Sequence, residues 1–341
     1  MKKYIEEKYS IFFIVIFIGL LILPLRGTAL NIQALDGSFY GRDRLIALAV
    51  DFRILIGDRV FPKVIIGRDH WLIYTPENSL DDYQNAIPLS EGDLALIQKS
   101  LDDFSVHLRR QGMTLLVVIP PNKNTIYPEY VPGEIPIIGK ESRLDQLLHY
   151  MEVNGQTRIL DLRPALLQAK QNRQVYYATD THWNEAGMFI GYHEIVVALE
   201  QDYPQLIPLP ESDFRISPPR QENLDLAQNI GTDLIAENVV KFLPKFDSHT
   251  TFKSLALGQR KITLSYNPDP SLPKAVIYHD SFFFPIMPFL SEHFSRAVYI
   301  QNYLGGGLWN ISWVEEEKPN VVILEFSERY LQDIPLLLGY K

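Results

Sequence analysis

Short apolar runs alternate with helical patterns along most of the chain. The run at residues 115–119 contains no polar residue, which is typical of a parallel strand covered on both faces. The same signature returns at residues 275–278, 297–300 and 321–324, and residues 158–162 form a similar run that includes Arg158 and Asp161. Between most of these runs, apolar residues recur at three- and four-residue steps, at 141–153, 164–173, 184–201 and 285–294. Strands that alternate with helices predict an α/β fold, in which helices cover both faces of a parallel sheet.

The residues before this sheet carry two further patterns. Apolar positions recur at helical spacing within residues 31–60, which suits a juxtamembrane helix or stalk. Two β-rich runs, 64–66 and 71–74, flank a polar turn and predict a hairpin. We therefore expect one domain over residues 61–341, in which the proline-rich stretch 204–219 is a surface loop.

An uncharged apolar run of 16 residues, 10–25, follows three lysines near the N-terminus. A bilayer needs about 20 residues, and flanking lysine and tyrosine side chains extend such a run by reaching to the interface. We expect residues 1–30 to form an N-terminal transmembrane anchor. A signal peptide cleaved near residues 27–29, or a buried core helix, is the alternative. With an anchor or a signal peptide the remaining chain is exported, so we expect the domain in the periplasm or at the cell surface.

Composition and charge narrow the range of functions. The 341 residues include 32 Lys+Arg and 41 Asp+Glu, a net charge of −9. Residues 1–30 hold four basic and two acidic side chains, so the remainder has 28 against 39, or −11. An acidic chain lacks the basic footprint that nucleic-acid binding needs. The absence of cysteine excludes disulfides, thiolate metal sites and cysteine nucleophiles.

A serine follows one of the predicted strands at the edge where parallel sheets place their active sites. The strand at 275–278 is followed by His279, Asp280 and Ser281, and then by a helix-like segment. A serine in a strand-to-helix turn presents its hydroxyl beside free backbone N–H groups, which favour a developing oxyanion. The alternative is that Ser281 only caps the helix.

An acid and a histidine lie two residues apart in a second segment. Residues 177–184 end an extended stretch and precede a helix, and they include Asp180 and His182. If the stretch is extended, both side chains leave the same face. The carboxylate then holds one imidazole nitrogen while the other faces a nucleophile, as a catalytic triad needs. Alternatively, Asp180 is a helix cap and His182 packs against Trp183.

Together these segments resemble the AlgX/AlgJ family of polysaccharide O-acetyltransferases, whose catalytic domain is SGNH-hydrolase-like. The similar segments are spread in order over residues 60–332, at 67–74, 120–129, 180–187, 223–227, 280–282 and 319–331. The resemblance implies a flavodoxin-like three-layer sandwich with a permuted motif order, in which the acid and the histidine precede the serine. It also implies that Ser281 is the nucleophile, His182 the general base and Asp180 the acid that orients it.

Two features depart from the family pattern. His279 stands where ordinary members of the wider superfamily have glycine before Asp-Ser, and oxyanion donors beyond Ser281 cannot be assigned. The chain also ends soon after the last strand, which leaves no room for a C-terminal carbohydrate-binding module. The membrane-anchored AlgJ type is therefore the closer likeness.

The expected chemistry is acetyl transfer to hydroxyls of an exported polysaccharide through an acyl-enzyme on Ser281. By resemblance, a membrane-bound O-acyltransferase supplies the acyl group. An esterase with the same triad, and a non-catalytic scaffold of a polysaccharide assembly complex, are the alternatives. The eight histidines show no metal-ligand spacing, so the sequence predicts neither a metal nor a cofactor, although Asp180 and His182 offer two ligands.

Several side chains near these segments are candidates for contact with the glycan. Aromatic rings stack on sugars, and polar side chains bind an acidic or acetylated glycan. For the aromatic residues the alternative is core packing, and for the polar ones a solvated surface position. The aromatic candidates are Tyr177, Trp183, Tyr278 and Trp309, and the polar candidates are Asn122, Lys123 and Arg329.

Overall fold

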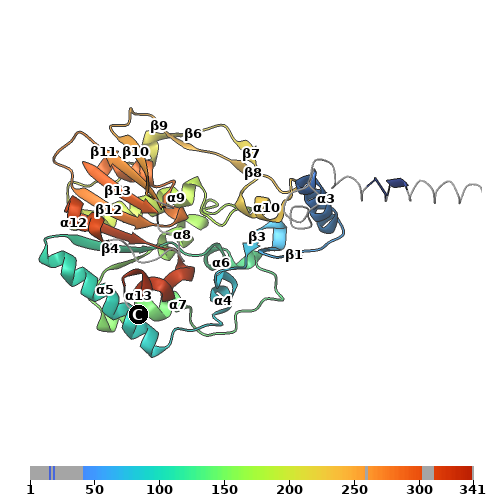
Figure 1. Ribbon diagram of the computed structural model, residues 1–341, viewed down its shortest axis with the longest axis horizontal. Coiled ribbons are helices and arrows are strands. Elements are labelled where there is room, and N and C mark those ends of the chain that lie inside the picture. The colour runs from blue at the N-terminus through green and yellow to red at the C-terminus, as the bar shows by residue number, and fades with distance from the viewer. Residues whose placement is uncertain (1–14, 17, 20–40, 258–259, 302–310, 340–341) are drawn as a thin grey trace, which may run out of the picture.

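A seven-stranded sheet forms the centre of the computed structural model, which describes residues 15–16, 18–19, 41–257, 260–301 and 311–339 (Figure 1). Its strand order is β10-β11-β13-β12-β14-β4-β5. The five predicted apolar runs are neighbours in it and all pair in parallel. These strands are β4 (Thr114–Ile119), β5 (Ile159–Asp161), β12 (Lys274–His279), β13 (Arg296–Gln301) and β14 (Val321–Glu325).

An antiparallel hairpin extends one edge of this sheet and corrects the expectation of a purely parallel one. It consists of β10 (Thr251–Leu257) and β11 (Arg260–Tyr266), and β11 pairs antiparallel with β13. In β11, Ile262 and Leu264 are buried while Lys261 is exposed. This alternation is typical of an edge hairpin with one solvated face, whereas the parallel strands were recognised by continuous apolar runs.

Helices cover both faces of the sheet, as predicted. Because side chains alternate along a strand, Leu116 and Val118 enter one core and Val117 and Ile119 the other. The second core includes α5 (Glu91–Arg110), α7 (Arg143–Asn154), α12 (Ser312–Glu317) and α13 (Ile334–Leu337). The first includes α8 (Arg163–Lys170), α9 (Glu185–Glu200) and α11 (Met287–Leu290). The molecule is thus the three-layer sandwich that was expected.

A small antiparallel sheet packs beside this sandwich and forms a third core with two helices. It contains the predicted hairpin, β2 (Val64–Ile66) with β3 (Leu72–Tyr74), and a further strand, β1 (Val60–Phe61). The helices are α3 (Arg42–Leu55), within the segment expected to be helical, and α10 (Asp225–Ile230). The Leu72 N–H donates to the Ala178 carbonyl, so the small sheet contacts the segment that carries Asp180 and His182.

The remaining elements are short. The expected helix at 285–294 is only α11 and a 3-10 turn, and the proline-rich stretch includes the first of four short outer strands. These elements are α4 (Ser79–Gln84), α6 (Lys123–Ile126), β6 (Phe214–Ile216), β7 (Arg220–Glu222), β8 (Glu237–Val239) and β9 (Phe242–Pro244), with 3-10 turns η2 (Arg68–His70), η3 (Pro128–Tyr130), η4 (Glu211–Asp213), η5 (Ser281–Phe283), η6 (Ser291–His293) and η7 (Glu328–Asp333).

The predicted N-terminal transmembrane helix lies almost entirely outside the described residues, as does Trp309. Among the helices of the described residues, none has the length and apolar character that crossing a bilayer requires. The expected domain boundaries at residues 30 and 60 stay predictions.

Candidate active site

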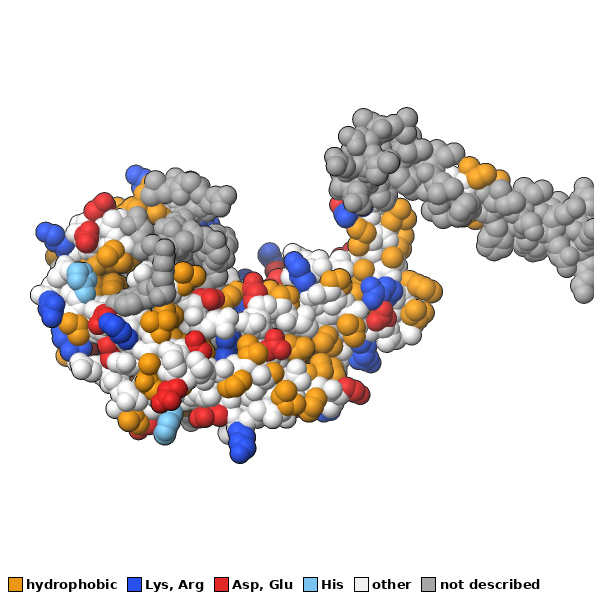
Figure 2. Space-filling model, turned by 60° about the horizontal axis from the view of Figure 1, so that its bottom comes forward, with side chains coloured by type: hydrophobic (Ala, Val, Ile, Leu, Met, Phe, Trp, Pro, Cys, Tyr) orange, Lys and Arg blue, Asp and Glu red, His pale blue; other side chains and the backbone are white. Residues whose placement is uncertain are grey.

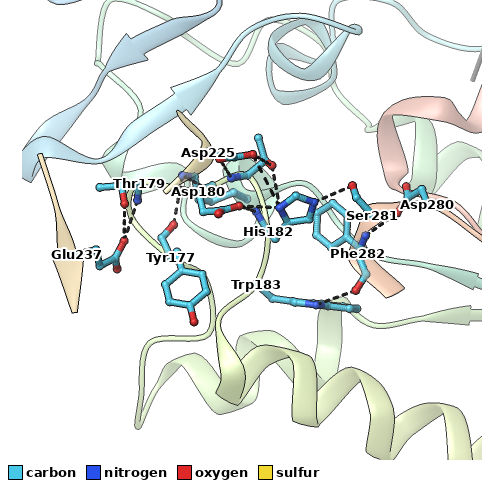
Figure 3. A network of polar contacts seen from close by, with 12 residues as sticks. Tyr177, Thr179, Asp180, His182, Trp183, Asp225, Glu237, Asp280, Ser281 and Phe282 are labelled. Carbon is cyan, nitrogen blue, oxygen red and sulfur yellow. Dashed lines mark hydrogen bonds and ion pairs between the residues drawn. The ribbon is translucent and has the colours of Figure 1, made fainter. Parts of the chain in front are cut away.

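Three side chains predicted to act together form a continuous hydrogen-bonded chain at the carboxyl edge of the sheet. His182 Nδ1 lies 2.6 Å from Asp180 Oδ1, and His182 Nε2 lies 2.7 Å from Ser281 Oγ (Figure 3). With Nδ1–H donating to the carboxylate, Nε2 is left to accept the hydroxyl proton. This order of contacts is the geometry of a Ser-His-Asp triad.

The acid and the histidine lie on a compact loop (residues 177–182, the Asp-His loop), and the expectation of an extended stretch was wrong. The chain forms a bridge between Tyr176 and Trp183, so the residues between them turn back on themselves. Asp180 Oδ1 also accepts the His182 backbone N–H at 2.9 Å, and this bond sets the turn. Burial by itself would raise the pKa of Asp180, but the bonds from His182 and the nearby Lys123 charge hold it below its usual value. Asp180 is therefore a carboxylate.

A buried lysine supports this loop from beneath. Lys123 Nζ donates to the carbonyl oxygens of Asp180 at 2.6 Å, Ala178 at 3.0 Å and Tyr177 at 3.3 Å. Burial lowers the pKa of Lys123 to about 8, although Asp180 and Asp225 partly oppose the shift. All three ammonium protons are directed at the loop, so the expectation that Lys123 contacts the glycan was wrong.

Asp225 is part of the site and had no role assigned from the sequence. Its Oδ1 accepts the Thr181 N–H at 2.9 Å and its Oδ2 accepts the Thr181 hydroxyl at 2.6 Å. Its Oδ2 also lies 3.9 Å from His182 Nδ1. Burial raises the pKa of Asp225, and the neighbouring Asp180 carboxylate adds to the rise. The only available signal was its place within residues 223–227, one of the segments that resemble the family.

Asp280 holds the turn that carries Ser281 (residues 280–283, the nucleophile turn). Asp280 caps η5: its Oδ1 accepts the Phe282 N–H at 2.8 Å and its Oδ2 the Ser327 N–H at 2.9 Å. Ser281 is therefore not the cap, and its hydroxyl faces His182 instead. Within the described part of the chain the Ser281 N–H donates to no acceptor, which leaves it for an oxyanion. Because η5 is a single 3-10 turn, this N–H and not a helix dipole is the stabilising group.

His279, the departure from Gly-Asp-Ser, is a structural residue of the same turn. Its side chain is buried and its Nδ1–H donates to the Asp280 carbonyl at 2.7 Å. Burial lowers the pKa of His279 to about 4, so the ring is neutral at pH 7. The substitution thus leaves the nucleophile turn intact.

Two of the aromatic candidates are core residues, and the expectation that they stack on sugar was wrong. The Trp183 ring is buried, and its Nε1–H donates to the Phe282 carbonyl at 3.1 Å, which ties the Asp-His loop to the nucleophile turn. A Cβ at Gly191 would lie 2.9 Å from this ring, so the glycine makes room for it. Tyr278 is fully buried in the core beneath α5. Neither ring has a free face.

Asn122 and Arg329 lie in a buried polar network under the nucleophile turn. Arg329 Nη1 donates to Asn122 Oδ1 at 3.1 Å, and the Asn122 N–H donates to Glu328 at 2.8 Å. Arg329 Cζ lies 5.7 Å from the centre of the Phe282 ring. Burial raises the pKa of Glu328 to about 7. Both side chains are buried, so their expected contact with the glycan was wrong as well.

Tyr177 alone among the described candidates is partly accessible. It lines a recess of about 530 Å³ whose wall includes Asn184, Glu185 and Glu237. Burial raises the pKa of Tyr177, and its hydroxyl has no hydrogen-bond partner in the described residues. Glu237 accepts the backbone N–H groups of Ala178 and Thr179 at 3.0 Å, so the recess adjoins the back of the Asp-His loop.

Asp180, His182 and Asp225 are close enough together to hold a cation, with ligand atoms within 4.8 Å of one another. Both imidazole nitrogens of His182 are engaged, one with Asp180 and one with Ser281. A metal on Nδ1 would replace the bond to Asp180. The arrangement therefore fits proton transfer better than metal binding.

Comparison with known proteins places these residues in a family context. A family model described as "SGNH hydrolase-like domain, acetyltransferase AlgX" matches residues 64–255. "Probable alginate O-acetylase AlgJ" of Pseudomonas syringae pv. tomato is 33% identical over 156 residues, which are 46% of this chain and 38% of that protein. AlgJ of Pseudomonas aeruginosa is 26% identical over 215 residues, 61% of this chain and 51% of that protein. The chain spans about half the length of these relatives, or less.

Solved structures share the fold. PatB1 of Bacillus cereus with a sulfonyl adduct superimposes with a TM-score of 0.58 and 16% identity, over 82% of this chain and 99% of that one. The O-acetyltransferase domain of Pseudomonas putida AlgJ gives a TM-score of 0.53 and 21% identity, over 80% and 93%. The matched region of the family model contains Asp180 and His182 and ends before Ser281. The geometry alone therefore brings the serine to the site.

Proposed function

Because the chain belongs to the AlgX family of SGNH hydrolase-like acetyltransferases, we propose that it transfers an acetyl group to hydroxyls of a polysaccharide through Ser281. The observation that carries this proposal is the contact of His182 with both Asp180 and Ser281, at 2.6 and 2.7 Å. The resemblance predicted from the sequence is confirmed by the family match.

The site supplies each proton-transfer step of acyl transfer. His182 Nε2 takes the Ser281 proton as Oγ attacks the acetyl carbonyl, and Asp180 holds the ring in the required tautomer. The Ser281 N–H donates to the oxyanion, an interaction worth about 3 kcal/mol. The imidazolium then protonates the leaving group. In the second half-reaction His182 deprotonates a sugar hydroxyl, which attacks the acetyl-enzyme and restores Ser281.

The names of the relatives support a glycan acceptor. Each is named "Probable alginate O-acetylase AlgJ", so we propose a polysaccharide of the alginate type as the acceptor. By resemblance, we also propose that a membrane-bound O-acyltransferase supplies the acetyl group and that the domain works outside the cytoplasm. The half-buried ring of Tyr177, on the wall of the recess, is the candidate for contact with the sugar.

A carbohydrate esterase is the second candidate, and one observation favours it. The His182 side chain is 25% exposed, so the triad is not closed off from water. Transfer and hydrolysis use the same three residues and differ in which hydroxyl reaches the acetyl-enzyme. A bound glycan prevails over water when positioning gives it an effective molarity of about 10⁵ M.

The experiment supplies the full chain with an acetyl ester donor, with and without alginate oligosaccharides. Acetylated glycan and free acetate are measured together for wild type, Ser281→Ala and Ser254→Ala; Ser254 is exposed on the edge strand β10. We expect glycan acetylation that Ser281→Ala abolishes and Ser254→Ala retains. Acetate as the only product would establish the esterase. Equal product from wild type and Ser281→Ala would overturn the triad.

A further inference from the structure

Helix α3 carries apolar residues on two opposite faces, and within the described part of the chain only one of them is covered. Toward the small sheet, Val50 is buried and Ile54 packs against the same core. The opposite stripe follows the i, i+4, i+7, i+8 spacing of one helix face. It consists of Leu48, Phe52, Leu55 and Ile56, and Val60 follows it at the start of β1; the exposed fractions are 58, 63, 76, 65 and 63%.

We call these five residues the outer face of α3; Leu48, Phe52, Leu55 and the C-cap Ile56 are neighbours on one side of the helix and are not isolated exposed side chains. Figure 2 shows hydrophobic side chains gathered at this end of the molecule. A contiguous apolar surface on a folded protein marks a site of contact with another apolar phase or partner. We propose that the outer face of α3 lies against the surface of a lipid bilayer.

The position of the helix in the chain favours a bilayer over a soluble partner. The uncharged apolar run at residues 10–25 ends only 16 residues before Arg42, the first residue of α3. Sixteen residues reach at most about 58 Å even when fully extended. If the run enters a membrane, α3 is therefore held near that membrane.

The charges around the face also fit lipid headgroups. Residues 42–63 contain five basic and three acidic side chains, a net charge of +2 in a chain whose total is −9. Arg44, Arg59 and Lys63, in the same segment as the apolar stripe, are exposed. An apolar stripe bordered by basic residues is the composition of a helix that lies in the interface of an anionic membrane.

Hydrogen bonds connect α3 to the candidate active site through α10. The Thr232 hydroxyl donates to Asp51 of α3 at 2.5 Å, and Thr232 follows α10. At the other end of α10, Asp225 holds Thr181 of the Asp-His loop. A membrane against α3 would therefore fix the orientation of the triad relative to the bilayer surface.

The absence of cysteine allows a direct test. Phe52→Cys in the full chain receives an environment-sensitive fluorophore, and the labelled protein is reconstituted into vesicles, with and without phosphatidylserine, whose lipids carry a nitroxide quencher. Val153→Cys is the matched control, because Val153 is 71% exposed on α7, a helix of the sheet's own layers. Leu48→Cys probes the same stripe one turn earlier.

We expect the lipid quencher to reduce fluorescence at positions 52 and 48 at least twofold more than at position 153, and more strongly with phosphatidylserine. Equal quenching at all three positions would overturn the proposal. Shielding of position 52 without lipid quenching, together with a disulfide between two Phe52→Cys chains, would identify a second copy as the occupant and would also overturn it. Phe52→Glu is expected to keep the melting temperature and the acetyl-ester hydrolysis rate of wild type. In Phe52→Glu, quenching of the label at position 48 is no longer expected to increase with phosphatidylserine.

Discussion

Replacing Lys123 with methionine tests how the Asp-His loop is held. The substitution keeps the apolar stem and removes an ammonium group that donates to three loop carbonyls. Hydrogen bonds from a charged donor are worth about 1.5–3 kcal/mol each, so the three together contribute roughly 5–9 kcal/mol before any offset. The folded-state pKa of about 8, against 10.5 for a free lysine, corresponds to a net cost of about 3 kcal/mol for the charged form, after Asp180 and Asp225 have offset part of the burial.

When this cost is subtracted from the hydrogen bonds, Lys123→Met loses a few kcal/mol of stabilisation. This loss affects the loop that carries Asp180 and His182. If about 3 kcal/mol of this loss appears as disorder of the triad, kcat falls about a hundredfold. The assay is steady-state hydrolysis of a small acetyl ester, which needs no glycan. Lys99→Met is the control, because Lys99 is exposed on α5 and its pair with Asp103 is a surface one; we expect it to retain wild-type rates.

The same lysine makes the stability depend on pH. Between about pH 8 and 10.5 the unfolded chain keeps a proton on Lys123 that the folded chain has released. The free energy of unfolding of wild type therefore rises through this window relative to Lys123→Met. An unchanged kcat for the ester, with a raised KM for the glycan only, would refute the reasoning and return Lys123 to the glycan-binding role.

Three further predictions concern the surroundings of the triad. Asp225→Asn removes a charge 3.9 Å from His182 Nδ1 and weakens the anchor of the loop, so kcat for ester hydrolysis is expected to fall about tenfold; wild-type kinetics would contradict this. Gly187→Ala places a Cβ 2.0 Å from a backbone carbonyl, so a large drop in melting temperature is expected, while Gly92→Ala, whose nearest neighbour is at 3.7 Å, should keep the wild-type value. The buried ring of His279 has a pKa of about 4 in the folded state and about 6.5 unfolded, so wild type loses up to about 3 kcal/mol of stability as the pH falls through this window; His279→Gln should lack this loss in denaturant titrations at pH 7 and pH 5.

The parallel strands could be predicted because a strand covered on both faces has to be apolar at every position. The hairpin β10–β11 was missed because its strands do not form continuous apolar runs: in β11 the buried Ile262 and Leu264 alternate with the polar Lys261 and Thr263. The order of the strands in the sheet could not be predicted from the local sequence pattern, because nothing in that pattern indicates that β12 lies between β13 and β14.

The triad residues could be predicted because Ser281 directly follows the apolar strand β12, and because an acid and a histidine two residues apart are the partners that such a serine needs. Their local geometry could not, because Asp180 and His182 meet through a turn and not along a strand. The sequence does not show whether an aromatic ring near a site is exposed or buried. The core positions of Trp183 and Tyr278 could therefore be recognised only in the folded structure.

The central claim, that Ser281 carries the acetyl group, is tested most directly by trapping the intermediate. The full chain is mixed with an acetyl ester donor, quenched in acid within the first turnover and digested, and the acetylated peptide is located by mass spectrometry. We expect one acetyl group on Ser281, which accumulates without glycan, disappears when the acceptor is added and is absent from His182→Ala. Acetylation of another residue, or glycan acetylation by Ser281→Ala at the wild-type rate, would contradict the account.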